Sequence, residues 1–264
     1  WIKIRHFLNQ IFKLIKHLTK LPLLKRLLPS IIRRICNLLN INFFVVRYEK
    51  IYLKLKIADA VDRHILFRGE YENAQIEYLL ESIKKNQIDY FIDIGSNIGL
   101  YSLLVEKNFP KIKIFSFEPH PEAFKRFEYN LKMNKSKNIS VHNIALSNEN
   151  KKSFLSTGDN NVKNFKNFQS GGAQVDVSGD IPIILSKGDD ILTNQNDVLG
   201  IKIDVEGHEN LVLNGINTLL IENKVFIQIE IHNEKFAKVN QILTTFGYKQ
   251  LKKIGFHDYY YSNF

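Results

Sequence analysis

The sequence FIDIGSNIG, residues 91–99, joins a predicted strand to a predicted helix through a turn that contains Gly95 and Gly99. In a parallel α/β sheet, ligands bind beyond the carboxyl ends of the strands, and this turn follows such an end. We expect Gly95 to let the backbone approach a ligand closely, and Gly99 to let the helix pack near the strand. The spacing Asp-x-Gly-x-x-x-Gly matches neither the dinucleotide fingerprint G-x-G-x-x-G nor a Walker loop. The turn therefore predicts a different kind of cofactor site.

Two carboxylates near this turn indicate which chemical groups the cofactor carries. Asp93 stands at the turn, where it would repel a pyrophosphate but would accept a hydrogen bond from an ammonium or hydroxyl group. Glu118 follows the next predicted strand, in the sequence FSFEP, where an acidic residue is placed to accept the hydroxyls of a ribose. Together they predict an adenosine-containing cofactor that has a cationic end and no pyrophosphate.

Strands and helices alternate regularly after residue 89, and this pattern predicts a parallel sheet covered on both faces. The final runs 248–252 and 257–261 should add an antiparallel pair at one edge. The polar region 148–188 contains three short strand-like runs, at 153–156, 173–177 and 181–185. The remaining predicted strands are 90–94, 113–117, 140–144, 200–204 and 225–231, and the predicted helices are 72–84, 99–107, 121–133, 209–214 and 235–246. A small hairpin is expected from 43–47 and 51–56.

The positive charge is concentrated in residues 1–40, which contain nine Lys or Arg residues and no Asp or Glu, whereas the rest of the chain holds 28 basic and 27 acidic residues. Residues 2–20 have the apolar spacing of an amphipathic helix, and a second short helix is expected at 30–39, after Pro29. No run is long and apolar enough to span a bilayer. One interpretation is peripheral contact with an anionic membrane. Another is packing on this domain or on a second copy in a homodimer. Nucleic-acid binding is the weakest, because the rest of the chain offers no basic groove.

The turn and the ribose carboxylate resemble those of the class I S-adenosylmethionine-dependent methyltransferases, over about residues 66–264. The more specific resemblance is to the FkbM family, on the strand-end sequence KIDVEG at 202–207. Other similar segments are Tyr71-Glu72, DIGSNIG at 93–99, FEPHP at 117–121, NIALS at 143–147 and QIEIH at 228–232. One departure is KGDDIL at 187–192, where the family more often has a T-L-D-D-L-like run.

The resemblance implies a Rossmann-like α/β fold with a mostly parallel seven-stranded sheet and an antiparallel C-terminal strand. Residues 1–42 would be a basic, amphipathic, helical segment and residues 43–264 the domain that binds S-adenosylmethionine. The residues implied for the cofactor are Asp93, Gly95, Ser96, Asn97 and Gly99 for the methionine end, Glu118 for the ribose, Asn143 and Ala145 beside the adenine, and Glu72 towards the amino group.

Charged residues end the fourth and fifth predicted strands. We expect Asp204 and Glu206 to converge with Glu230 and His232, because adjacent parallel strands bring their ends together, and we take all four as catalytic candidates. They would form either a base with its orienting partners, His232 or His208 being the base, or a site for a divalent metal. The sequence leaves both open; we favour the metal-free form, because Glu206 and His208 can instead line the start of the next helix.

Lys202 is expected to be structural, since a lysine on a central strand is costly unless it is paired. Glu209 is expected to be a charge in the first turn of a helix.

The expected reaction is methyl transfer from S-adenosylmethionine to a hydroxyl of a sugar, glycan or lipid-linked saccharide. The alternative acceptors are another small metabolite or the ribose of RNA. Exocyclic amines are disfavoured, because the fourth strand ends in Asp-Val-Glu-Gly rather than an Asn-Pro-Pro-Tyr-like sequence. A nicotinamide-dependent oxidoreductase is disfavoured by the absent G-x-G-x-x-G. A further hypothesis is a membrane-tethered module that binds the cofactor without catalysis. We expect a cytoplasmic protein, with attachment to the cytoplasmic membrane face left open.

Overall fold

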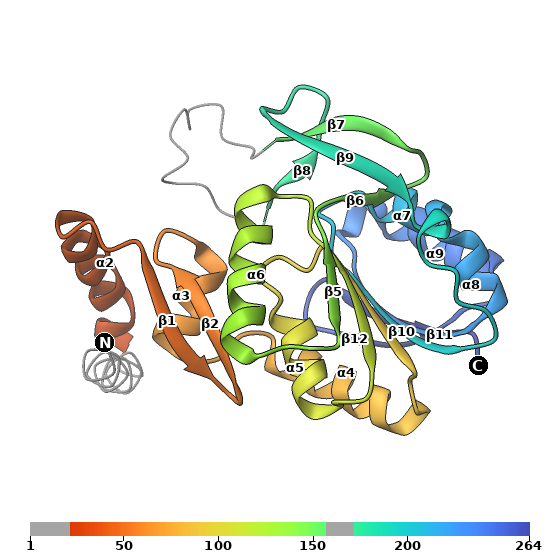
Figure 1. Ribbon diagram of the computed structural model, residues 1–264, viewed down its shortest axis with the longest axis horizontal. Coiled ribbons are helices and arrows are strands. Elements are labelled where there is room, and N and C mark those ends of the chain that lie inside the picture. The colour runs from red at the N-terminus through yellow and green to blue at the C-terminus, as the bar shows by residue number, and fades with distance from the viewer. Residues whose placement is uncertain (1–21, 157–171) are drawn as a thin grey trace. The chain divides into compact units, whose positions relative to one another are not determined.

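The computed structural model describes residues 22–156 and 172–264, and the chain divides into two compact units (Figure 1). The first contains the described residues up to Asn73, and the second contains those from Ala74 onwards. The expected helix at 2–20 lies outside the described residues. The expected domain boundary between residues 42 and 43 does not coincide with this division and stays a prediction.

The first unit consists of helix α2 (Pro22–Leu38), strands β1 (Phe43–Tyr48) and β2 (Ile51–Lys56), and helix α3 (Ala60–Arg68). The two strands pair as the predicted antiparallel hairpin. Asp59 caps α3, because its side chain accepts a hydrogen bond from the Val61 N–H at 3.1 Å.

Helix α2 is continuous through Pro29, so the expected break and separate helix at 30–39 are wrong. A proline inside a helix removes one backbone hydrogen bond and bends the axis, but the turns on either side can continue. No helix in the described part of the chain has both the length and the apolar character that a membrane span requires.

The second unit is built on a seven-stranded sheet of order β12-β13-β11-β10-β3-β4-β5. Its strands are β3 (Tyr90–Ile94), β4 (Lys113–Phe117), β5 (Ile139–His142), β10 (Val198–Ile203), β11 (Lys224–Glu230), β12 (Lys249–Ile254) and β13 (Asp258–Ser262). Neighbouring strands from β5 to β11 are parallel, and β13 is antiparallel to both β11 and β12. This confirms the predicted class I fold with its antiparallel C-terminal strand.

Helices lie on both faces of this sheet (Figure 1). Helices α4 and α5 lie on one face, and α7, α8 and α9 lie on the other, while α6 packs beside β5. Their bounds are α4 (Asn73–Asn86), α5 (Leu100–Asn108), α6 (Pro121–Asn134), α7 (Glu209–Gly215), α8 (Asn217–Glu222) and α9 (Phe236–Thr245), with short 3₁₀ turns at Gly188–Asp190 and Asn233–Lys235. The sequence predicted all of these helices except α8.

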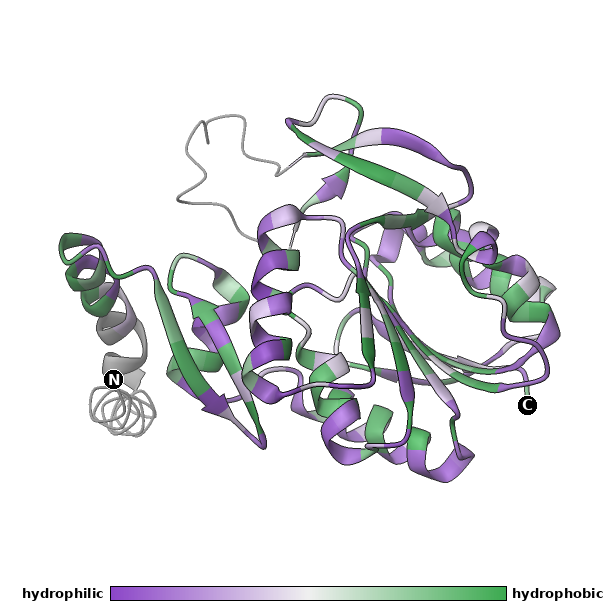
Figure 2. Cartoon of the chain, viewed as in Figure 1, coloured by the Kyte–Doolittle hydropathy of each residue, from purple (hydrophilic) through white to green (hydrophobic). Residues whose placement is uncertain are grey.

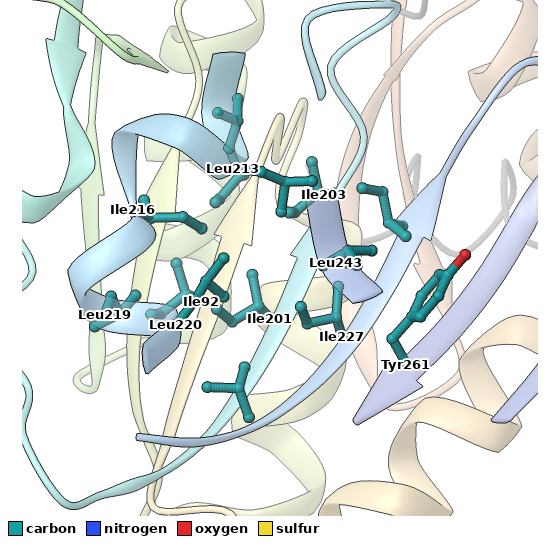
Figure 3. Packing of buried hydrophobic residues seen from close by; sticks show 14 of the residues in the cluster. Ile92, Ile201, Ile203, Leu213, Ile216, Leu219, Leu220, Ile227, Leu243 and Tyr261 are labelled. Atoms are coloured by element: carbon teal, nitrogen blue, oxygen red, sulfur yellow. The ribbon is translucent and has the colours of Figure 1, made fainter. Parts of the chain in front are cut away.

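The main core lies between the sheet and helices α7 to α9. Ile92, Ile201 and Ile227 extend from adjacent strands towards Leu213 of α7 and Leu243 of α9, and all are buried (Figure 3). Apolar colour follows the strands in Figure 2, whereas α6 is largely hydrophilic. Each buried aliphatic side chain contributes about 1.5–3 kcal/mol relative to exposure, so this layer holds the strand ends in place.

A second, four-stranded sheet of order β6-β9-β7-β8 is inserted between β5 and β10. It contains β6 (Ala145–Ser147), β7 (Lys151–Ser156), β8 (Gln174–Val175) and β9 (Ile181–Lys187). The sequence predicted the short runs of β7 to β9 but not β6, because it extended the strand at 140–144 across the end of β5. Pairing between β6 and β9 depends on residues about 40 positions apart, which local patterns do not reveal.

Candidate active site

The glycine turn after β3 packs directly against the end of β10. Gly95 has φ +81°, and a β-carbon there would lie 1.7 Å from the backbone oxygen of Asp204. The Asp204 N–H donates a hydrogen bond to the Ile94 oxygen at 2.9 Å. Residue 95 must therefore be glycine because the turn contacts the neighbouring strand end. The sequence predicted a different reason, the close approach of a ligand.

The second glycine of the turn is required by a helix. Gly99 has φ +81° at the start of α5, and a β-carbon there would lie 2.0 Å from the ring of Phe127 on α6. The expectation of close packing is correct, but the element packed against Gly99 is α6 rather than the preceding strand. Asn130, also on α6, donates from Nδ2 to the Ile98 oxygen at 2.9 Å. Helix α6 thus stabilises the turn through side-chain packing at Gly99 and a hydrogen bond to Ile98.

Glu118 joins the tip of β4 to the glycine turn. Its Oε2 accepts a hydrogen bond from the Asn97 N–H at 2.7 Å, and its Oε1 accepts one from the His120 N–H at 2.7 Å. Burial raises the pKa of Glu118 to about 7, against the lowering effect of these two hydrogen bonds. An ionised carboxylate has about four acceptor positions, so both oxygens retain capacity for the hydroxyls of a ribose.

Three polar side-chain atoms in the turn are buried without a hydrogen-bond partner among the described residues: Asp93 Oδ1, Ser96 Oγ and Asn97 Oδ1. The other oxygen of Asp93 accepts from the Ser102 N–H at 3.2 Å and from its hydroxyl at 2.5 Å. Buried polar atoms are costly unless they are hydrogen-bonded. Two acceptors and a hydroxyl in one turn fit a ligand that carries an ammonium group, such as the methionine end of S-adenosylmethionine.

The remaining cofactor candidates lie in three different settings. Asn143 donates from Nδ2 to the backbone oxygens of Glu118 and Pro119, at 2.8 and 3.0 Å, so it orders the loop after β4. Ala145 is buried at the start of β6. Glu72 belongs to the first unit and has φ +49°. Their roles towards adenine and the amino group stay predictions.

Lys202 occupies the centre of a polar row that crosses the sheet. It lies in register with Asp93 on β3 and with Gln228 on β11, so these three side chains share one face. Lys202 Nζ is 2.8 Å from Asp204 Oδ2 and 4.6 Å from the ring centre of Tyr101. Burial raises the pKa of Asp93, and the charge of Lys202 opposes that rise. The predicted structural ion pair of Lys202 is confirmed.

Hydrogen bonds extend this polar row to residues that were not predicted as site residues. Gln228 Nε2 donates to the Tyr101 hydroxyl at 3.3 Å and to Asp258 Oδ1 at 3.2 Å. Gln75 Nε2 donates to Asp258 Oδ2 at 3.0 Å. Gln228 is a polar residue on an otherwise apolar strand, which was the available signal, and only the tertiary structure joins it by hydrogen bonds to Tyr101 and Asp258.

Glu206 and His232 are brought together from the ends of adjacent strands. Glu206 Oε2 lies 3.7 Å from His232 Nε2, and both side chains are partly exposed. Burial and then the charge of Asp204 raise the pKa of Glu206, and His232 opposes this. The ring centre of His232 is 4.7 Å from that of His257, whose Nδ1 is buried without a hydrogen-bond partner in the described chain. The site therefore contains a carboxylate–imidazole pair that solvent reaches.

Glu230 and His208 are the other two candidates near these strand ends, and they lie in different settings. Glu230 ends β11 in register with Asp258 of β13, and its catalytic role stays a prediction. His208 Nε2 is 2.9 Å from the Ser147 hydroxyl, and burial lowers the pKa of His208 to about 4. The imidazole is thus neutral at neutral pH and links α7 to β6, so the geometry favours His232 over His208 as the base.

The start of α7 has its own supporting contacts. Glu209 Oε1 accepts from the Gly207 N–H at 2.6 Å, as suits a carboxylate in a first helical turn. Lys235 Nζ donates to the Gly207 oxygen at 2.7 Å, and a β-carbon on Gly207 would lie 2.2 Å from that nitrogen. Lys235 was not among the predicted site residues; the tertiary fold brings it to the KIDVEG segment from the 3₁₀ turn that follows β11.

A divalent metal was the second possibility that the sequence left open for the four catalytic candidates. No group of three or more His, Cys, Asp or Glu side chains within residues 22–156 and 172–264 is placed to hold a metal ion. Asp204 is paired with Lys202, and Glu206 faces His232. The metal-free form and the form with a divalent metal both stay predictions.

The methyltransferase FkbM domain matches residues 93–250, from Asp93 of the glycine turn into β12. The chain belongs to the FkbM methyltransferase family. The FkbM match spans the turn, Glu118 and the strand ends with Glu206 and His232. The chain is thus an S-adenosylmethionine-dependent methyltransferase.

The chain is also similar in sequence to two proteins named as methyltransferases. The chain is 30% identical over 169 residues to the hexuronic acid methyltransferase AglP of Haloferax volcanii, covering 62% of this chain and 63% of that protein. It is 24% identical over 181 residues to methyltransferase 1 of Beauveria bassiana, covering 60% of this chain and 72% of that one.

Solved methyltransferase structures are also similar to the FkbM-family chain. One is the precorrin-6y C5,15-methyltransferase of Geobacter metallireducens, with a TM-score of 0.44, 14% identity, and coverage of 73% of this chain and 87% of that chain.

Proposed function

We propose that this FkbM-family protein methylates a hydroxyl of a sugar, glycan or lipid-linked saccharide. The observation that carries the proposal is the Glu206–His232 pair, because it joins a carboxylate and an imidazole at the ends of β10 and β11. Asp204, at the end of β10, also contacts the glycine turn through Gly95. The candidate base and the candidate cofactor turn are therefore neighbours.

The residues of the turn fit the cofactor that the family uses. S-adenosylmethionine, when bound, supplies a methyl group already activated by its sulfonium. Asp93, Ser96 and Asn97 offer buried polar atoms for its methionine end, and Glu118 offers carboxylate oxygens for its ribose. Each hydrogen bond to a charged group typically contributes about 1.5–3 kcal/mol, so this set could supply substantial affinity.

The carboxylate–imidazole pair would take the proton of the acceptor hydroxyl. In this proposal His232 accepts that proton through a ring nitrogen, and Glu206 orients the ring and stabilises its protonated form. Asp204 is one-quarter exposed and would orient the hydroxyl. General-base assistance of this kind contributes about 10²–10⁴-fold in rate, which suits transfer of an already activated methyl group.

The choice of a sugar acceptor is supported by the name of one relative, the hexuronic acid methyltransferase AglP. A hexuronic acid offers both hydroxyl and carboxylate oxygens. Methyl transfer to the first makes an ether, which is stable to mild alkali, and transfer to the second makes an ester, which is not. The Glu206–His232 pair favours the hydroxyl, because a carboxylate acceptor is already ionised and needs no base.

The experiment is methyl transfer from radiolabelled S-adenosylmethionine to hexuronic acids, neutral glycans, lipid-linked saccharides, small metabolites and RNA. We expect alkali-stable label on a saccharide. Alkali-labile label on a hexuronic acid would replace the hydroxyl with a carboxylate acceptor. Label on RNA or on a non-saccharide metabolite alone would overturn the sugar assignment.

A further inference from the structure

Helix α2 presents a row of apolar side chains to solvent. Ile31, Ile35 and Leu38 follow the i, i+4, i+7 spacing of one helical face, and they are 50%, 48% and 83% exposed. Leu39 follows directly and is also exposed, whereas Cys36 is buried. We call Ile31, Ile35, Leu38 and Leu39 the α2 face. Contiguous exposed apolar side chains of this kind mark an interaction surface more often than scattered ones do.

Positive charge accompanies the α2 face: at 100° per residue Arg34 lies beside this face and Arg33 lies on the opposite side of the helix. Arg33 and Arg34 are exposed on the same helix. The first acidic residue in the chain is Glu49, so the 48 residues before it carry no negative charge. An exposed apolar row beside unopposed cations is the pattern of a helix that lies in a membrane interface, with its apolar face in the lipid and its arginines at the headgroups.

We propose that the α2 face binds the surface of an anionic membrane. Three surfaces could cover the α2 face: a membrane, a second copy of the chain, or residues 1–20. Charge distinguishes them. A second copy would bring one cationic helix against another, and residues 1–20 carry five basic and no acidic groups, so covering α2 with them would also gather like charges. Anionic lipid headgroups neutralise these charges, and each basic residue near such a surface contributes about 1 kcal/mol.

Membrane binding would give the proposed activity a location. Only the choice of an acceptor, below, rests on the proposed function. An enzyme held at the membrane surface meets saccharides linked to a lipid at a high local concentration. Of the acceptors in the proposal, the lipid-linked saccharide is therefore the one that the α2 face favours. Membrane binding itself depends on residues of the first unit and is measured without any methyl acceptor.

The test is flotation of the full chain with vesicles of phosphatidylcholine alone and with about 30% phosphatidylglycerol, at about 0.1 M salt, where screening is moderate. We expect binding to the anionic vesicles only. The variant Arg33→Gln/Arg34→Gln should bind about tenfold or more weakly, since it removes two basic residues. The variant Ile31→Ser/Ile35→Ser/Leu38→Ser should lose most binding.

The matched control is Ile184→Ser/Ile221→Ser, which removes two similarly exposed apolar side chains of the second unit and should float like the unaltered chain. Circular dichroism and thermal unfolding report whether each variant is folded, the altered helix included. Flotation of the triple variant equal to that of the unaltered chain would overturn the proposal, as would equal binding to neutral vesicles. A dimer that forms without vesicles and is lost in the triple variant would replace the membrane with a second copy.

Discussion

Lys202 and Asp204 form an ion pair at the carboxyl end of β10, with 2.8 Å between Nζ and Oδ2. Lys202 is also in register with Asp93, the carboxylate at the cofactor turn. One buried cation thus stands between a carboxylate expected to face the cofactor and one expected to face the methyl acceptor. Its removal would leave two negative charges near each other in a poorly hydrated place.

We expect Lys202→Met to lower the free energy of unfolding by about 3 kcal/mol, because removal of one partner leaves a buried charge uncompensated. Urea denaturation measures the change. Lys113→Met is the control, since Lys113 is exposed on β4 and should change stability by less than about 0.5 kcal/mol. Equal losses in the two variants would show that the ion pair does not stabilise the sheet.

Gly95→Ala should be far more damaging than Gly247→Ala. Both glycines have similar φ, +81° and +84°, but a β-carbon at Gly95 would meet the Asp204 oxygen at 1.7 Å, whereas nothing lies within 4 Å at Gly247. The shared backbone strain costs about 1–2 kcal/mol, and only Gly95 adds a collision with backbone. Thermal unfolding of both variants checks this, and similar melting temperatures would refute the close approach of turn and strand end.

The buried carboxyl of Glu118 should make the free energy of unfolding depend on pH. Burial raises its pKa from 4.5 to about 7, so between these pH values the folded protein holds a proton that the unfolded chain has released. Stability should therefore fall as pH rises through this range, by about 3 kcal/mol from this residue. Glu118→Gln cannot titrate and should lose that decline.

The measurement for Glu118 is urea unfolding at several pH values from 4.5 to about 8, comparing the unaltered chain with Glu118→Gln. Glu77→Gln is the control, because Glu77 is exposed on α4. Its curve should run parallel to that of the unaltered chain. A Glu118→Gln curve that also ran parallel would contradict the buried, protonated carboxyl.

Substitution of the candidate base should slow turnover without weakening cofactor binding. We expect His232→Gln and Glu206→Gln each to lower kcat by about 10²-fold or more, while S-adenosylhomocysteine binds with unchanged affinity in calorimetry. Glu234→Gln is the matched control, since Glu234 is an exposed carboxylate two residues from His232. Full activity of both site variants would remove the pair from the reaction.

Strands with a strong local signal were predictable. The bounds of β3 and β4 agree residue by residue with the prediction, because each is a short apolar, β-branched or aromatic run with turn residues after it. The strand β10 was predicted about two residues late, since Val198 and Leu199 follow a polar loop without a clear break. Helix α8 and the separate small sheet were missed, because the turn at Ile216 and the pairing of β6 with β9 depend on distant residues.

The sequence by itself determined the class of fold and the cofactor turn, because alternation of apolar residues and glycine spacing are local properties of the chain. The tertiary structure alone decided which groups meet. It placed Gly95 against Asp204, Gly99 against Phe127, and Glu206 beside His232. The reason is physical: strand register, steric exclusion at a β-carbon and loss of water around a buried charge arise only when segments far apart in sequence are packed together.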